Sequence, residues 1–271
     1  MSKRNSQATK SAARERLRAE RERQAKKDKT RRQIVVGVST VAVVAIAGGV
    51  GWGVMQLNKP GHWEAAKDAK NVTAPKNTSG ENGTTVVIGK STAKKTLEMY
   101  EDPRCPICAT LEQALGETVH KDVDAGKYKI KYIGATFIDG MTQGEGSKNA
   151  LSALGAALNV SPEAFLDYKS ELFSAKNHPE ETDDKFKDDA YLIKIADSVD
   201  ALKGNKAFQK DVEDGTYDSW AMKMSATFEK SGVKGTPTLK MDGKTVTGKD
   251  GQNAPMTVAD FNTAIDKALK G

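Results

Sequence analysis

The sequence predicts an α/β domain carried by a single transmembrane helix, and three observations lead to this prediction. Near the N-terminus, a basic segment is followed by 24 uncharged residues, 34–57. Between residues 96 and 132, the apolar pattern changes from that of a strand to that of a helix and back. After a long helical stretch, two short β-like runs and a last helix follow, so the order of elements is β, α, β, a helical block, β, β, α.

The N-terminal segment is expected to anchor the chain in a membrane. Residues 1–33 carry 13 Lys and Arg against 4 Asp and Glu, a net charge of +9, whereas the whole chain carries +6. As a helix, residues 34–57 would span about 36 Å, enough for a hydrocarbon core of roughly 30 Å. The alternative is a cleaved signal peptide, but its apolar region is typically shorter and ends in an A-x-A-like site, which GWGVMQLNKPGHW lacks.

This anchor sets the expected topology of a single-pass cell-membrane protein. Positive flanking charge favours the cytoplasmic side, so residues 1–33 form a cytoplasmic tail and residues 58–271 face outward. The tail is expected to attract anionic lipid, and no nucleic-acid partner is expected. Residues 58–84 are rich in Asn, Thr, Gly, Lys and Ala and are interpreted as a flexible linker. One outward-facing domain over residues 85–271 remains.

A strand, a helix and a second strand are expected between residues 96 and 132. TLEMY (96–100) is interpreted as a strand that runs into a loop at 101–104. Pro106 then stands in the first turn of a helix, where its missing N–H is not needed. Tyr128, Ile130 and Tyr132 alternate with lysines, as in a half-buried strand. The apolar helix residues recur every four positions up to Gly126: Ile107, Leu111, Leu115, Val119 and Val123.

Helical spacing then predominates from about residue 145 to 230, and the chain closes with a hairpin and a helix. Asp242-Gly243 separates two short β-like runs, which is a strong signal for a two-residue hairpin. The closing helix carries Phe261, Ile265 and Leu269 on one face. Four apolar stripes are expected in the helical block: Leu151, Leu154 and Leu158; Phe165, Tyr168 and Leu172; Leu192, Ile195, Val199 and Leu202; and Tyr217, Trp220, Met224 and Phe228.

The chain holds two cysteines, Cys105 and Cys108, spaced as C-x-x-C. A structural zinc site is not expected, because zinc takes four ligands and the three histidines are not paired at ligand spacing. A structural disulfide across so short a loop would constrain the unfolded chain little. A dithiol that cycles between reduced and oxidised states remains. Cys105 at the helix start would lie at the positive end of the helix dipole, which favours its thiolate.

The order of elements, with C-P-x-C at the first helix and G-T-P-T before the hairpin, resembles that of DsbA-like thiol–disulfide oxidoreductases of the thioredoxin superfamily. The resemblance covers about residues 85–271 and rests on EDPRCPIC (101–108) and GVKGTPTLKMDGK (232–244). It implies a thioredoxin-like fold with an inserted helical domain at about 145–230. The membrane anchor is similar to that of the membrane-anchored bacterial members of the family.

The resemblance also implies the roles of the site residues. Cys105 is expected to be the nucleophile and Cys108 the resolving thiol, with their disulfide as the only redox group and no metal or other cofactor. Pro237 is expected to follow a cis peptide bond and to lie against the cysteine pair. Substrate peptides are expected to contact Thr236, Pro106 and Ile107.

Two features depart from the family pattern. Many relatives keep a buried acid six residues before the nucleophile, where this chain has Met99 and the neighbouring Glu98 faces the other side of the strand. The residues between the cysteines are Pro106 and Ile107, so no basic side chain stabilises the thiolate from there. Arg104 is expected to favour the thiolate.

We therefore predict an extracytoplasmic oxidoreductase that promotes disulfide formation in secreted or surface proteins. Its partners would be reduced or misoxidised secreted proteins and an unidentified redox partner that recycles the dithiol. A reductase or isomerase of the same fold stays open, because potentials from about −270 to about −120 mV differ by only about 7 kcal/mol. A non-enzymatic tethered module that binds extended peptides or Cu(I) is the other alternative.

Overall fold

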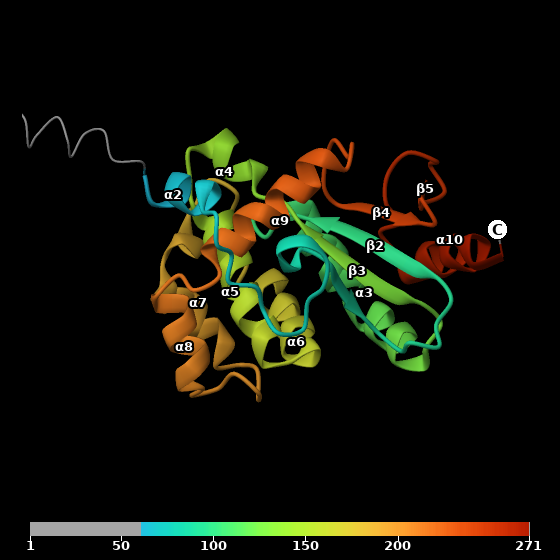
Figure 1. Ribbon diagram of the computed structural model, residues 1–271. Coiled ribbons are helices and arrows are strands. Elements are labelled where there is room, and N and C mark those ends of the chain that lie inside the picture. The colour runs from blue at the N-terminus through green and yellow to red at the C-terminus, as the bar shows by residue number, and fades with distance from the viewer. Residues whose placement is uncertain (1–60, 271) are drawn as a thin grey trace, which may run out of the picture. The chain divides into compact units, whose positions relative to one another are not determined.

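The computed structural model describes residues 61–270, and within them five strands form one mixed sheet (Figure 1). The strand order is β1-β3-β2-β4-β5. Among these strands β2 and β3 run parallel, and the other neighbouring pairs are antiparallel. The strands are β1 (Val86–Ile88), β2 (Thr96–Glu101), β3 (Lys129–Gly134), β4 (Thr238–Met241) and β5 (Lys244–Thr245).

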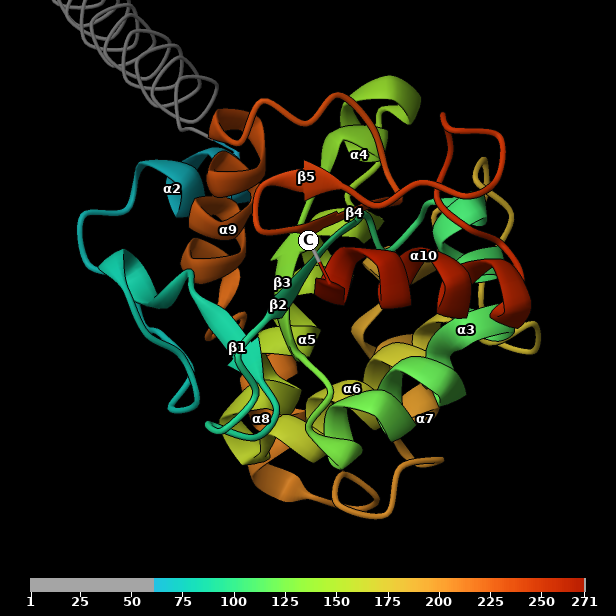
Figure 2. The ribbon, with the colours of Figure 1, turned by 90° about the vertical axis from the view of Figure 1, so that its right-hand side faces the viewer.

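Helices cover both faces of this sheet. Figure 2 shows α3 and α10 on one side of the sheet and α9 on the other. Because successive strand residues point to opposite faces, Leu97 and Met99 of β2 enter the core cluster shared with α3, whereas Tyr100 packs edge-on against Phe228 of α9. The helices are α2 (His62–Asp68), α3 (Pro106–Ala125), α4 (Phe137–Thr142), α5 (Gly146–Val160), α6 (Pro162–Phe173), α7 (Asp189–Ala196), α8 (Lys206–Glu213), α9 (Asp218–Lys230) and α10 (Val258–Lys270), with short 3-10 turns η1 (Glu81–Gly83) and η2 (Lys185–Lys187).

The predicted strand–helix–strand unit is confirmed as the parallel crossover β2-α3-β3. Pro106 is the first residue of α3, and Gly126 ends the helix in the left-handed conformation, with φ 77°. One residue of the predicted apolar face differs, because Ile107 is 55% exposed. Ile107 lies in the first turn of α3, which begins five residues after the end of β2.

The helical block is confirmed in type, although its boundaries differ from those predicted. Its centre is α5, whose leucine stripe is fully buried. The block begins earlier than residue 145, with α4, and contains the additional helix α8. The third stripe is not one helix: α7 ends at Ala196, and Val199 and Leu202 are buried from consecutive turns. The fourth stripe forms α9, which lies on the sheet against β3 and therefore belongs to the α/β layer structure.

The C-terminal hairpin is confirmed. Met241 pairs with Lys244 across a two-residue turn in which Asp242 and Gly243 have φ 50° and 77°. Both values are positive, as a type I′ turn requires, which explains why the Asp-Gly pair specifies this hairpin.

The linker interpretation of residues 58–84 is wrong for residues 61–84, which pack on the domain. Trp63 of α2 is 9% exposed, and Nζ of Lys148 in α5 lies 5.7 Å from the centroid of the Trp63 ring. The indole Nε1 of Trp220 donates to the carbonyl of Gly83 at 2.8 Å, and Nδ2 of Asn77 donates to the carbonyl of Leu158 at 2.7 Å. Composition misled here because a few long-range contacts hold a polar segment in place.

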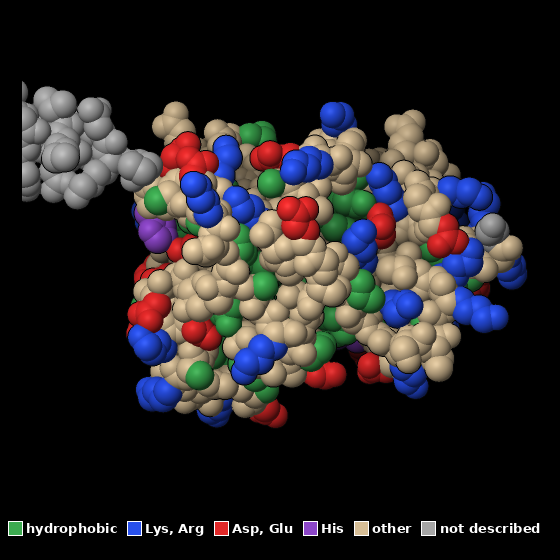
Figure 3. Space-filling view, viewed as in Figure 1, with side chains coloured by type: hydrophobic (Ala, Val, Ile, Leu, Met, Phe, Trp, Pro, Cys, Tyr) green, Lys and Arg blue, Asp and Glu red, His purple; other side chains and the backbone are tan. Residues whose placement is uncertain are grey.

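The predicted anchor at 34–57 and the tail at 1–33 lie outside the described residues. Between residues 61 and 270, no helix is both long enough and apolar enough to cross a membrane. Figure 3 shows Lys and Arg side chains interspersed with Asp and Glu over one face of the domain.

Candidate active site

Cys105 and Cys108 lie at the start of α3, beyond the end of β2. Cys105 is the N-cap residue of the helix, and its Sγ accepts a hydrogen bond from the backbone N–H of Cys108 at 3.4 Å. Both cysteines are free thiols in this structure. Cys105 is 5% exposed and Cys108 is 0% exposed, so an approaching partner meets Cys105 first.

The two thiols differ strongly in acidity. The pKa of Cys105 is lowered to about 6. The largest cause is the hydrogen bond that the Cys108 thiol donates to Cys105, and burial opposes the shift. Thr236 and the backbone N–H groups of Cys108 and Ile107 also lower it. Burial raises the pKa of Cys108, and the negative charges of Cys105 and Glu101 raise it further. A thiolate therefore forms at Cys105 first.

The loop before β4 brings Thr236 and Pro237 against the cysteine pair from 131 residues away along the chain. The Thr236–Pro237 peptide bond is cis, as the resemblance implies. The Cys105 thiol lies 3.5 Å from the backbone carbonyl of Thr236. A groove of about 650 Å3 is lined by Ile107, Thr236 and Pro237 together with, among others, Lys249 and Met256.

A buried charge network adjoins the cysteines. Glu101, the last residue of β2, is fully buried, and among the described residues Lys169 is the one ion-pair partner of its carboxylate. Lys169 of α6 lies between two carboxylates, with its Nζ 3.2 Å from Glu101 Oε2 and 2.5 Å from Glu112 Oε2. Burial raises the pKa of Glu101 to about 7 although Lys169 opposes the shift. Glu101 can therefore gain or lose a proton near neutral pH.

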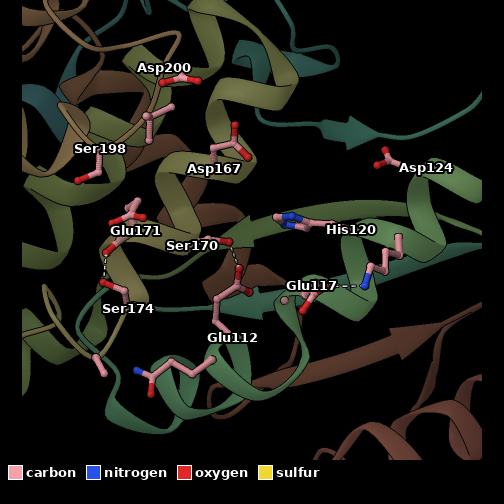
Figure 4. A pocket seen from close by; sticks show the side chains of 15 residues that line it. Glu112, Glu117, His120, Asp124, Asp167, Ser170, Glu171, Ser174, Ser198 and Asp200 are labelled. Carbon is pink, nitrogen blue, oxygen red and sulfur yellow. Dashed lines mark hydrogen bonds and ion pairs between the residues drawn. The ribbon is translucent and has the colours of Figure 1, made fainter.

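The far end of this network reaches solvent. Glu112 and Ser170 point toward each other, with Ser170 Oγ donating to Glu112 Oε1 at 2.5 Å (Figure 4). Both residues line a pocket of about 630 Å3 between α3 and α6. Within residues 61–270, no three His, Cys, Asp or Glu side chains are grouped as a metal site would require.

Comparison with known proteins identifies the family. The family model described as "Thioredoxin" matches residues 81–267. The chain belongs to this thioredoxin family.

Several proteins similar to this thioredoxin-family chain carry names of disulfide-forming proteins or disulfide oxidoreductases. Disulfide bond formation protein D of Bacillus subtilis (strain 168) is 24% identical over 189 residues, which cover 68% of this chain and 77% of that protein. The reduced disulfide bond oxidoreductase DsbG of Mycobacterium tuberculosis has 25% identity and a TM-score of 0.55, over 69% of this chain and 92% of that one. The oxidised DsbA of Mycobacterium tuberculosis has 25% identity and a TM-score of 0.54, over 69% and 98%. The chain is a thiol–disulfide oxidoreductase of the DsbA type.

The structure confirms one sequence-based expectation about this DsbA-like site and corrects another. Glu98 lies on the other side of the strand, as predicted, and accepts hydrogen bonds there from Tyr100 and Lys131. The buried acids that precede the cysteine pair are Glu101 and Asp102, four and three residues before Cys105. Arg104 does not support the thiolate, because its guanidinium pairs with Asp139 and Asp184.

Lys169 and Glu112 are functional candidates that the sequence reading missed. A signal was present, since each stands within an apolar helix stripe. Lys169 lies four residues after Phe165, and Glu112 lies three residues before Leu115. Charged residues are almost never fully buried unless they are paired, so two such exceptions on facing helices indicate an ion pair.

Proposed function

We propose that this oxidoreductase promotes disulfide formation in secreted or surface proteins through the pair Cys105 and Cys108. The observation that carries the proposal is the difference in acidity between the two thiols at the helix start. The name of the Bacillus subtilis relative, a disulfide bond formation protein, supports oxidation as the direction.

The reaction proceeds in two exchanges. A client thiolate attacks Sγ of Cys105 in the oxidised pair, forming a client–Cys105 disulfide and releasing Cys108 as a thiolate that takes up a proton. A second client thiolate then attacks the client sulfur of that mixed disulfide and releases the Cys105 thiolate. The client loses two electrons and the enzyme pair gains them. A thiol of low pKa is a good leaving group, which favours release of Cys105 in the second exchange.

Glu101 is proposed as the group that supplies and removes the proton of Cys108. Cys108 is fully buried, so bulk water does not reach it directly. Its raised pKa means that a newly released thiolate needs a proton. A carboxyl group with a pKa of about 7 is close to half protonated at neutral pH and serves both directions.

The thiolate contributes a limited amount to the reduction potential. A Cys105 pKa of about 6 in place of about 8.5 stabilises the reduced form by at most about 1.4 kcal/mol at pH 7, or about 30 mV. This shift is in the oxidising direction. It covers only about a fifth of the interval of about 150 mV between thioredoxin and DsbA.

We also propose that the domain works outside the cell membrane, tethered by residues 34–57. Residues 1–33 would be cytoplasmic and held near anionic lipid. The clients would be reduced or misoxidised secreted proteins, and an unidentified redox partner would reoxidise the dithiol. The groove lined by Ile107, Thr236 and Pro237 supports an extended client peptide as the ligand. Pro106, next to Ile107 in the chain, is proposed to contact the same peptide.

The reduction potential of the full chain, measured against glutathione, tests the direction. We expect a value more oxidising than about −200 mV, together with faster refolding of a reduced, disulfide-dependent test protein. Cys105→Ser should abolish this acceleration. A potential near that of thioredoxin, with no difference between the wild type and Cys105→Ser in refolding, would contradict the proposal.

A further inference from the structure

The three residues before Cys105 are all held by the helical block. Asp102 accepts hydrogen bonds from Ser147 Oγ at 2.6 Å and from the backbone N–H of Ile138 at 3.2 Å. The carbonyl of Pro103 lies 3.1 Å from Nε2 of His178. Arg104 reaches furthest into the block. The backbone between the end of β2 and the nucleophile is therefore fixed from outside the sheet.

Arg104 is the longest side chain of this attachment, and it is only 1% exposed. Its Nη1 lies 2.9 Å from Asp139 Oδ1 and 2.9 Å from Asp184 Oδ1, and its Nη2 donates to the carbonyl of Glu181 at 2.7 Å. Asp184 in turn accepts from the backbone N–H groups of Glu145 and Gly146. A single side chain thus joins the cysteine loop to α4, to the start of α5 and to the segment before η2.

Two glycines leave the space for this ion pair. A Cβ at position 144 would lie 2.2 Å from Arg104 Nη1 and 2.8 Å from Asp184 Oδ1. A Cβ at position 146 would lie 2.6 Å from the same Asp184 oxygen. Gly140, in contrast, has nothing within 4 Å of its added Cβ. Arg104 and Asp184 therefore pack directly against the backbone at positions 144 and 146. This steric fit does not depend on charge, and it indicates a fixed place for the guanidinium.

We propose that Arg104 is a positioning residue, which through Asp139 and Asp184 uses the helical block to hold Cys105 against the first turn of α3. The inference rests on the proposed function and deepens it. The Arg104 backbone immediately precedes Cys105, whose N–H donates to the carbonyl of Asp102 at 2.9 Å. Displacing this loop lengthens the contact between Cys105 Sγ and the backbone N–H of Cys108, which is one of the bonds that stabilise the thiolate.

Asp184→Asn in the full-length protein tests this proposal, because positioning and charge alone predict opposite changes in the pKa of Cys105. Through charge alone, removing the negative Asp184 would stabilise a nearby thiolate and lower the pKa of Cys105 or leave it unchanged. Through positioning, the loop relaxes and the pKa rises. We expect a rise of about one unit, so that the thiolate fraction at pH 6 falls from about one half to about one tenth. Asp183→Asn, which breaks only the exposed pair with Lys185, is the matched control.

Gly144→Ala provides a second test without any change of charge, and Gly140→Ala is its control. The pKa of Cys105 is read from the pH dependence of alkylation, which a uniform loss of stability does not shift. We expect Asp184→Asn and Gly144→Ala to raise this pKa and both controls to keep it. If the folded Asp184→Asn variant has a Cys105 pKa equal to or lower than that of the wild type, the proposal is overturned. If Gly144→Ala does not fold, the result for Asp184→Asn decides by itself. A wild-type pKa near 8.5 would instead contradict the proposed function.

Discussion

Replacing Glu101 by glutamine removes the proposed proton carrier of Cys108 and keeps the shape of the side chain. The carboxyl has a pKa of about 7, and Cys108 is 0% exposed. Loss of a positioned acid–base group costs roughly 10²–10⁴-fold in rate. Because Cys108 is fully buried, we expect the attack of Cys108 on the mixed disulfide to slow by at least about a hundredfold at pH 7.

The first exchange responds differently, and this separates a proton-transfer role from a structural one. The negative charge of Glu101 raises the pKa of Cys108 and also repels the Cys105 thiolate. Replacing Glu101 by glutamine therefore does not destabilise the Cys105 thiolate. Formation of the mixed disulfide between reduced enzyme and glutathione disulfide is therefore expected to keep its wild-type rate. In the wild type, the rate of resolution should rise with pH through about 7 as Glu101 ionises, and this rise should be absent in Glu101→Gln.

Rapid acid quench followed by mass spectrometry measures both steps, because the mixed disulfide is heavier by one glutathione. Glu98→Gln is the matched control, since Glu98 lies on the same strand and accepts from Tyr100 and Lys131 instead of facing the cysteines. Resolution by Glu101→Gln within about threefold of the wild-type rate would refute the reasoning. Equal slowing by Glu98→Gln would refute it as well.

Three further predictions concern stability. Lys169→Met leaves two buried carboxylates unpaired and should lower the free energy of unfolding by about 3–5 kcal/mol, measured by urea denaturation. Trp63→Ala should cost about 3 kcal/mol in the same assay, because α2 packs on the domain; a change below about 0.5 kcal/mol would mean that residues 61–84 are dispensable. The raised pKa of Glu101, from 4.5 to about 7, makes the native state bind more protons than the unfolded chain between these values. Stability should therefore fall by up to roughly 3 kcal/mol as pH rises from 4.5 to 7, and Glu101→Gln should flatten this dependence.

Local signals in the sequence predicted much of the fold. The four-residue spacing from Leu111 to Val123, with Gly126 as the stop, defined α3, and Asp242-Gly243 defined the hairpin. The same kind of signal failed where the chain lacks strong local preference. Val199 and Leu202 are buried as predicted but from turns, because burial of a side chain does not require the helix to continue.

The sequence by itself determined the cysteine pair and its place at a helix start, since C-x-x-C spacing, Pro106 and helical periodicity are properties of a few neighbouring residues. Only the tertiary structure shows that Glu101 is buried, where Arg104 points and that the carbonyl oxygen of Thr236 lies 3.5 Å from Cys105 Sγ. The reason is physical. The pKa of Glu101 and the partners of Arg104 depend on burial and on charges that packing brings from distant segments, and neither can be seen in the residues next to them.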